Sequence, residues 1–137
     1  MTTSDIIIIG AGPGGYETAV EAAANGLSTT IIEAAMPGGT CLNEGCIPTK
    51  TLCKSAEVAD TLADAANLGF EVSYSANWNR VMERKNEVVG KLVSGVEFLL
   101  RNKLITYVKG TARFVDAHTV AVGDETYSAP NIVIATG

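Results

Sequence analysis

The sequence is poor in charged side chains, in aromatic side chains and in cysteine, and it has a single histidine. Ten basic residues against 15 acidic ones give a formal net charge of −5 over 137 residues, so we expect no nucleic-acid partner. No apolar run approaches the roughly 20 residues that cross a membrane, and we expect neither a membrane span nor a secretory signal. Three cysteines are too few for a disulfide scaffold, which favours a cytoplasmic protein whose cysteines do chemistry.

Small residues are abundant instead, with 18 alanines and 14 glycines in a chain that is 47% hydrophobic. Such a composition excludes a disordered chain and allows backbone segments to approach each other, or a ligand, closely. The sequence ends at Gly137, directly after the apolar run 132–135, whereas domain ends are usually polar. We therefore expect the sequence to be cut from a longer chain.

The first 33 residues carry the pattern of a strand–helix–strand unit. Residues 6–9 are four isoleucines, which is typical of a buried parallel strand. Helix formers fill residues 16–25 and end at Gly26, and a second apolar strand is predicted over residues 29–33.

A glycine fingerprint, Gly10-x-Gly12-x-x-Gly15, lies between the first strand and the helix. Its glycines allow a tight turn, close approach to a pyrophosphate, and close packing of helix on strand. Glu33 ends the second strand 18 residues after Gly15, where an acid hydrogen-bonds the ribose of a dinucleotide. The pattern favours FAD or NAD over NADP; the alternative is a ligand-free turn with a solvated acid.

The rest of the chain predicts two helices and then a series of short strands. The helices are expected over residues 49–67 and 78–102, with the Val and Leu face of the second in the core and Trp78 packed at its start behind an Asn77 cap. Period-two patterns then predict strands at 105–107, 113–115, 119–122 and 126–128, and a buried strand at 132–135. The fold class is therefore α/β, a Rossmann-like parallel sheet with helices and a small antiparallel meander.

The most specific motif is Gly38-Gly39-Thr40-Cys41-Leu42-Asn43-Glu44-Gly45-Cys46-Ile47-Pro48-Thr49-Lys50. On a regular helix, cysteines five residues apart would be about 8–9 Å apart between Cα atoms, beyond the roughly 7 Å that a disulfide spans. Gly45 and Pro48 lie where distortion of the backbone costs least. A redox disulfide is favoured, with a metal site or two buried thiols as alternatives; a metal would need ligands from Cys53 and His118, which are distant in sequence.

Three further residues have side chains that could take part in chemistry. Lys50 lies one turn beyond Cys46, where a cation would favour an electron-rich ring nitrogen, although a solvated lysine is the usual role. Cys53 is expected to be a packed thiol. His118 is expected in an exposed turn rather than as an acid–base group, and no metal site is expected.

Taken in order along the chain, these motifs resemble the N-terminal part of the class I pyridine nucleotide–disulfide oxidoreductases, flavoenzymes that join FAD, a disulfide and a nicotinamide nucleotide. The best match within the family is the dihydrolipoamide dehydrogenases, on the cysteine block and the segment 102–110. Glutathione and mercuric reductases share the cysteine frame and remain alternatives, and residues 127–130 have some similarity to the glutathione enzymes. Glu44 departs from the family, which usually has an apolar residue there, and this puts ordinary redox tuning in question.

The resemblance implies an FAD-binding domain over residues 1–137 in a three-layer ββα arrangement. It implies Cys41 as the thiol that exchanges with dihydrolipoamide and Cys46 as the thiol that faces the flavin. The FAD contacts that it implies are Gly10, Gly12, Pro13, Gly14, Gly15, Glu33, Gly39, Thr40, Cys41, Cys46, Lys50, Gly110, Ala112, Ala135, Thr136 and Gly137.

The reaction that the resemblance implies belongs to the whole protein: dihydrolipoamide and NAD⁺ give lipoamide and NADH. The implied partners are a second copy in a homodimer and lipoyl groups of a 2-oxoacid dehydrogenase or glycine cleavage complex. The 137 residues contain neither a second glycine fingerprint for NAD nor the family's His-Pro element. We therefore expect this segment alone to show no turnover, as a non-catalytic FAD-binding module or a stable fragment would, and assign the reaction to the whole protein.

Overall fold

The four isoleucines form the middle of a parallel sheet in the computed structural model, which describes all 137 residues. The strand order is β4-β3-β2-β8, and all neighbours are parallel. The strands are β2 (Ile6–Ile9), β3 (Thr29–Glu33), β4 (Ile105–Lys109) and β8 (Asn131–Ile134). Because the strands are parallel, the carboxyl ends of β2, β3 and β8 lie at one edge of the sheet.

A second sheet covers one face of the first, with strand order β1-β7-β6-β5. Its strands are β1 (Thr2–Thr3), β5 (Arg113–Asp116), β6 (Thr119–Val122) and β7 (Glu125–Ser128). Strands β5, β6 and β7 form the predicted antiparallel meander. The two-residue strand β1, which pairs parallel with β7, was not predicted.

Alternation along the central strands divides the core in two. Ile8 and Ile31 face the helices and pack with Val96 and Leu100. Ile7 and Ile32 face the other way and pack with the meander, through side chains that include Val120 and Tyr127. The resulting layers of helix, parallel sheet and meander confirm the predicted α/β fold.

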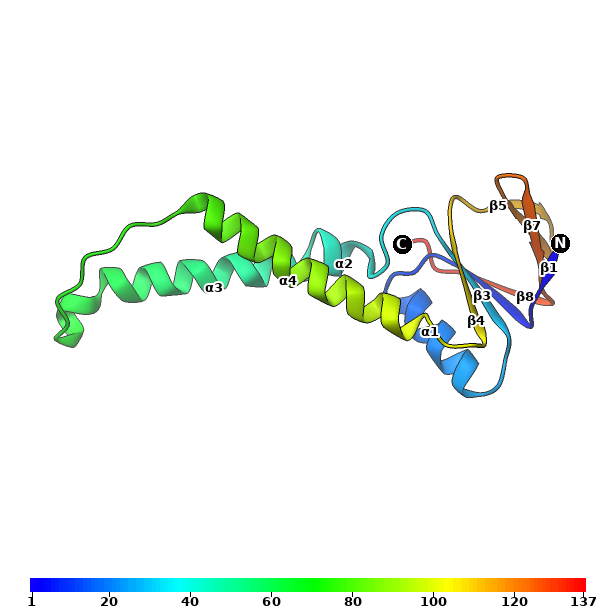
Figure 1. Cartoon of the computed structure of the whole chain (residues 1–137), viewed down its shortest axis with the longest axis horizontal. Helices are drawn as coiled ribbons and strands as arrows, with labels where there is room; N and C mark the ends of the chain where they lie inside the picture. Colours follow the sequence, from blue (N-terminus) through cyan, green and yellow to red (C-terminus); the bar gives the residue numbers. More distant parts are fainter.

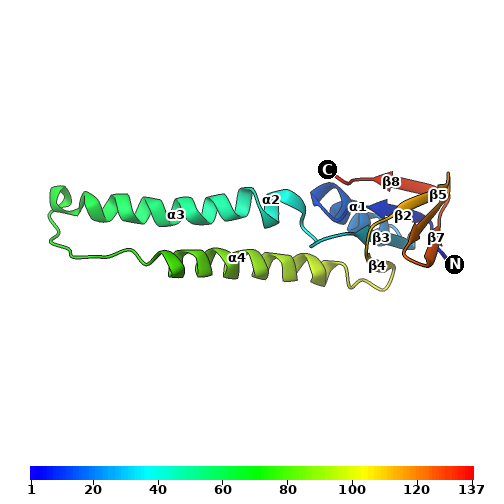
Figure 2. The ribbon, with the colours of Figure 1, turned by 90° about the horizontal axis from the view of Figure 1, so that it is seen from above.

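The helices belong to two groups. Helix α1 (Pro13–Ala24) packs on the sheet, while α2 (Gly39–Asn43), α3 (Cys46–Ala63), the 3-10 turn Ala65–Leu68 and α4 (Trp78–Leu99) lead out and back. Figures 1 and 2 show α3 and most of α4 as a two-helix arm that projects from the sheets. None of the helices combines the length and apolar composition that crossing a bilayer requires.

The arm corrects several side-chain predictions. Only the C-terminal end of α4 reaches the core, through Val93, Val96 and Leu100, whereas Leu92 and Leu99 of the predicted apolar face are exposed. Trp78 was expected to be packed, but it is 66% exposed. Cys53 was expected to be packed and is an exposed free thiol. The four exposed residues lie on the sides of α3 and α4 that no other element covers.

Candidate functional site

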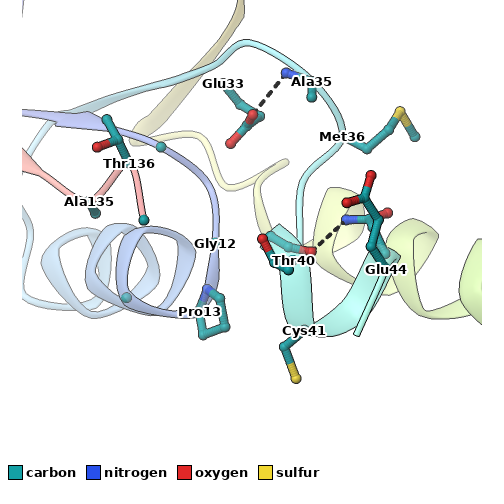
Figure 3. Close-up of a pocket in the computed structure, with 15 residues that line it drawn as sticks. Gly12, Pro13, Glu33, Ala35, Met36, Thr40, Cys41, Glu44, Ala135 and Thr136 are labelled. Carbon is teal, nitrogen blue, oxygen red and sulfur yellow. Dashed lines mark hydrogen bonds between the residues drawn. The ribbon is translucent and has the colours of Figure 1, made fainter. Parts of the chain in front are cut away.

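A cavity of about 690 Å³ lies at the edge of the parallel sheet where β2, β3 and β8 end. Its wall consists of the turn after β2, the segment after β3, helix α2 and the last three residues of the chain (Figure 3). Segments far apart in sequence meet here because parallel strands deliver their carboxyl ends to one side.

Glycine is required where these segments touch. Gly10 has a φ of +103°, and a Cβ there would overlap the carbonyl oxygen of Ala135. Gly39 has a φ of +65°, and its Cβ would lie 2.8 Å from the Cα of Gly12. The backbone N–H groups of Gly12 and Gly14 donate no hydrogen bond within the chain. The turn therefore presents bare backbone donors at the start of α1, which suits a phosphate.

Glu33 is held in place by the backbone around it. One carboxylate oxygen accepts a hydrogen bond from the Ala11 N–H at 2.7 Å, and the other accepts from the Ala35 N–H at 2.8 Å. Burial, followed by the charges of Glu33 and Glu97, raises the pKa of Tyr107, which pairs with Ile31 of β3. The carboxylate is thus fixed at the cavity wall with lone pairs left for a ligand hydroxyl.

A disulfide joins Cys41 to Cys46 across the break between α2 and α3. Gly45, with φ −119° and ψ −103°, interrupts the helical path and brings the two Cα atoms to 4.7 Å. The Asn43 side chain donates to the carbonyl oxygens of Pro37 and Gly39, at 3.1 and 3.0 Å, and holds the turn before the break. The predicted distortion of the backbone at Gly45 is confirmed.

The cavity brings together most of the residues named from the sequence. Those that line it are Gly10, Gly12, Pro13, Gly14, Glu33, Gly39, Thr40, Cys41, Ala135, Thr136 and Gly137. Five others lie outside its lining: Gly15, Cys46, Lys50, Gly110 and Ala112. Gly15 packs against the Gly10 carbonyl, and Gly110 donates to the Glu33 carbonyl oxygen at 2.8 Å. Lys50 is exposed and makes no ion pair.

Four lining residues were not predicted as contacts: Ala35, Met36, Asn43 and Glu44. The position of Ala35 and Met36, directly after Glu33, was the available signal for the first two. Asn43 and Glu44 lie inside the cysteine block, between Cys41 and Cys46, and that position was the available signal for them. His118 lies in an exposed turn between β5 and β6, as expected. No group of three metal-ligating side chains is present.

The family model described as pyridine nucleotide-disulphide oxidoreductase matches residues 4–137. The chain belongs to this family. Among its members, the chain is 45% identical over 139 residues to a dihydrolipoyl dehydrogenase of Staphylococcus aureus, covering 98% of this chain and 30% of that protein. It is 44% identical over 135 residues to the dihydrolipoyl dehydrogenase of Mycoplasma pneumoniae, and the match covers 97% of this chain and 30% of that protein.

A solved structure of the family has the same fold. It is the Cu(II) complex of the HOCl-induced flavoprotein disulfide reductase RclA from Escherichia coli, with a TM-score of 0.80 at 33% identity. The superposition covers all of this chain and 29% of the RclA chain. The chain therefore spans about 30% of the length of each of these three proteins.

Proposed function

We propose that residues 1–137 form the FAD-binding, disulfide-carrying domain of a dihydrolipoyl dehydrogenase. The observation that carries the proposal is the Cys41–Cys46 disulfide at the rim of a glycine-walled cavity. In the whole protein the reaction would be dihydrolipoamide and NAD⁺ to lipoamide and NADH. A homodimer acting in the cytoplasm on the lipoyl groups of a 2-oxoacid dehydrogenase or glycine cleavage complex is part of the same proposal.

The residues at the cavity fit an adenine dinucleotide. The free N–H groups of Gly12 and Gly14, at the positive end of α1, would bind the pyrophosphate. The fixed carboxylate of Glu33 would accept a ribose hydroxyl. Side chains at Gly12 and Gly39 would fill the space between the two loops. The chemistry that FAD supplies when bound is two-electron oxidation and reduction.

The disulfide has a preferred direction of opening. Cys46 is the first residue of the 18-residue helix α3, where the helix dipole stabilises a thiolate, whereas Cys41 lies within the five-residue α2. Cys46 is therefore the better leaving group, and a dithiol would attack the sulfur of Cys41. The second thiol of the substrate then displaces Cys41. The substrate becomes a cyclic disulfide, and its two electrons and two protons appear as the two cysteine thiols.

The test has two arms. Equilibrium dialysis of the chain with FAD measures the cofactor site, and absence of binding up to about millimolar FAD would refute it for this chain. Mixing the oxidised chain with dihydrolipoamide should yield two new protein thiols per chain. Cys41→Ser should leave Cys46 free and abolish this reaction without loss of the fold. The chain alone should show no NADH-linked turnover even with FAD present.

A second candidate is a flavoprotein disulfide reductase with another oxidant. The similarity to the RclA structure, at 33% identity over the whole chain, supports this second candidate. Assay of the whole protein with lipoamide, glutathione disulfide and Hg(II) in parallel separates the candidates. A rate with lipoamide no greater than with the other two would contradict the dihydrolipoyl dehydrogenase proposal.

A further inference from the structure

The charged side chains that line the cavity are all acidic. Its 15 lining residues include two carboxylates, Glu33 and Glu44, and no lysine, arginine or histidine. Lys50 lies outside the lining, and Lys85 lines a separate groove along α4. No cationic side chain is therefore available inside the cavity to offset the acids or a ligand's phosphates.

The two carboxylates differ in how they are held. Both oxygens of Glu33 accept backbone N–H groups, which absorbs part of its charge. The Glu44 side chain takes part in no hydrogen bond, and every ion pair of the chain lies on the arm. Only its backbone is fixed, by donation from its N–H to the Thr40 carbonyl oxygen at 2.9 Å. Glu44 is an uncompensated negative charge at the cavity wall.

Glu44 is exposed and lines the same cavity as the glycine turn. Figure 3 shows Gly12 and Pro13 on one side of the cavity and Thr40 and Glu44 on the other. In the same view the Glu44 carboxylate and the Cys41 sulfur point in opposite directions. Because Glu44 is one of the lining residues, a ligand held in the cavity would lie within the field of its charge.

We propose that Glu44 weakens the binding of phosphate-bearing dinucleotides and makes their affinity rise with ionic strength. This inference rests on the proposed FAD site. Attraction for the pyrophosphate comes only from uncharged N–H groups and the α1 dipole, while Glu44 repels it through space. Salt screens the repulsion, so binding tightens as salt is added. The dependence is opposite in sign to that of a phosphate site built from lysine or arginine.

The test compares FAD dissociation constants for the unaltered chain and Glu44→Gln, which keeps the shape of the side chain and removes its charge. Coulomb repulsion across a solvated cavity predicts that Glu44→Gln binds FAD about three- to ten-fold more tightly at about 10 mM salt. At about 1 M salt the two constants should agree within about two-fold. Riboflavin, which has no phosphate, should bind the two proteins equally.

Glu71→Gln is the matched control. It makes the same change of charge in the exposed segment at the far end of the arm, where Glu71 has no ion pair. It should leave FAD affinity within about two-fold of the unaltered chain at every salt concentration. Circular dichroism of each variant checks that the fold is retained.

The outcomes separate this inference from the proposed function. Equal or weaker FAD binding by Glu44→Gln at low salt overturns the inference and leaves the FAD site standing. Equal tightening by Glu71→Gln would also overturn it, because net charge and not position would then be the cause. Absence of FAD binding by every folded variant refutes the cofactor site itself, and the inference with it.

Discussion

Two adjacent glycines at the start of α1 have opposite requirements. A Cβ on Gly15 would overlap the carbonyl oxygen of Gly10, whereas a Cβ on Gly14 would meet nothing within 4 Å. We expect Gly15→Ala to lower the free energy of unfolding by about 2–3 kcal/mol, because backbone must move to admit the methyl group. Gly14→Ala should leave it unchanged or raise it by about 0.5 kcal/mol, since alanine favours the helix.

Urea denaturation of both variants measures this difference. Equal destabilisation by the two substitutions would contradict the packing at Gly15. The comparison also shows what a fingerprint hides: Gly10, Gly12 and Gly15 share one motif, yet Gly15 serves the packing of α1 on the sheet and does not line the cavity.

Acid stability depends in part on Asp5, at the start of β2. Its carboxylate accepts hydrogen bonds from the Ser28 hydroxyl at 2.6 Å and the Ser28 N–H at 2.8 Å, and these lower its pKa from the model-compound value of 3.8. A lowered pKa stabilises the folded chain above about pH 4, and this contribution is lost as the pH falls through the folded value. Asp5→Asn should therefore be less stable than the unaltered chain at pH 6, by a margin that narrows toward pH 3.

Urea midpoints at several pH values provide the measurement. Asp116 also has a lowered pKa, chiefly from the His118 N–H, so the unaltered chain and Asp5→Asn should both retain some acid sensitivity. If the difference in stability between the unaltered chain and Asp5→Asn stays constant from pH 6 to pH 3, the charge of Asp5 does not contribute to that difference.

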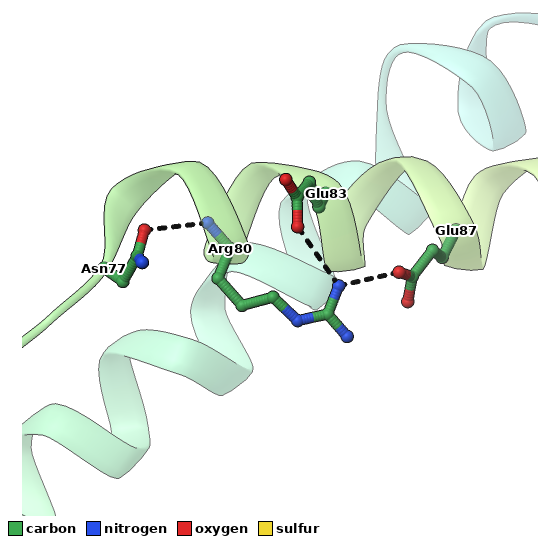
Figure 4. Close-up of polar contacts among 4 residues, drawn as sticks. All are labelled: Asn77, Arg80, Glu83 and Glu87. Atoms are coloured by element: carbon green, nitrogen blue, oxygen red, sulfur yellow. Dashed lines mark hydrogen bonds and ion pairs between the residues drawn. The ribbon is translucent and has the colours of Figure 1, made fainter.

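The first turns of α4 offer a comparison between a helix cap and an ion-pair network (Figure 4). The Asn77 side chain accepts a hydrogen bond from the Arg80 N–H at 3.1 Å. The Arg80 guanidinium donates to Glu87 at 2.7 Å and to Glu83 at 3.4 Å, with all three side chains more than half exposed. Caps stabilise helices by about 1 kcal/mol, whereas exposed ion pairs contribute about 0–1 kcal/mol.

Asn77→Ala should therefore cost about 1 kcal/mol of unfolding free energy, and Asn77→Asp should restore most of it. Arg80→Ala should cost less than about 0.5 kcal/mol. Denaturation curves of the three variants, with hydrogen exchange of the first turn of α4, measure the effects. A larger loss for Arg80→Ala than for Asn77→Ala would reverse this order.

At the scale of elements, the sequence predicted strands better than helix faces. The apolar runs at 6–9 and 29–33 give the bounds of β2 and β3, because strands buried on both sides need little beyond their own residues to define them. Periodicity identified an apolar face on α4, but it could not say what covers that face. Leu99 was predicted buried and is exposed, while Leu100 is buried, because the sheet contacts one side of the last turn only.

In the candidate site too, some residues could be predicted from local sequence and others could not. The glycine turn, Glu33 and the cysteine pair were predictable because local chemistry dictates them. The contribution of Asn43 and Glu44 to the cavity arises from the path of the chain between β3 and α3. Such a path depends on the meeting of distant segments, which no local pattern records.

The whole molecule exposes more surface than its size requires. Its accessible area is 8614 Å², against about 6,800 Å² for a compact monomer of this mass. Only 23 of 137 residues are buried, and exposed apolar side chains gather toward the end of the arm, among them Leu68, Phe70, Tyr74 and Trp78. The arm accounts for this excess area, because few of its side chains pack against other elements. The arm is therefore the part of the chain that packing stabilises least.

The first site of proteolysis should therefore lie at the arm's end. Residues 71–77 are all exposed and belong to no helix or strand, and none of their N–H groups donates a backbone hydrogen bond. A protease needs about this length of extended, unbonded chain, and local opening costs least there. Chymotrypsin, at a low ratio of protease to protein, should cut first beside Phe70, Tyr74 or Trp78. Mass spectrometry should then identify two fragments.

The two fragments should stay together under native conditions. Packing of α3 on α4 and pairing of β4 with β3 join residues on both sides of the cut. Replacing Phe70, Tyr74 and Trp78 by serine should slow this cleavage without changing the unfolding midpoint by much, because all three side chains are largely exposed. First cleavage within the meander β5–β7 instead would contradict the exposed arm. Protection of the arm that increases with protein concentration would show that contacts between copies cover it.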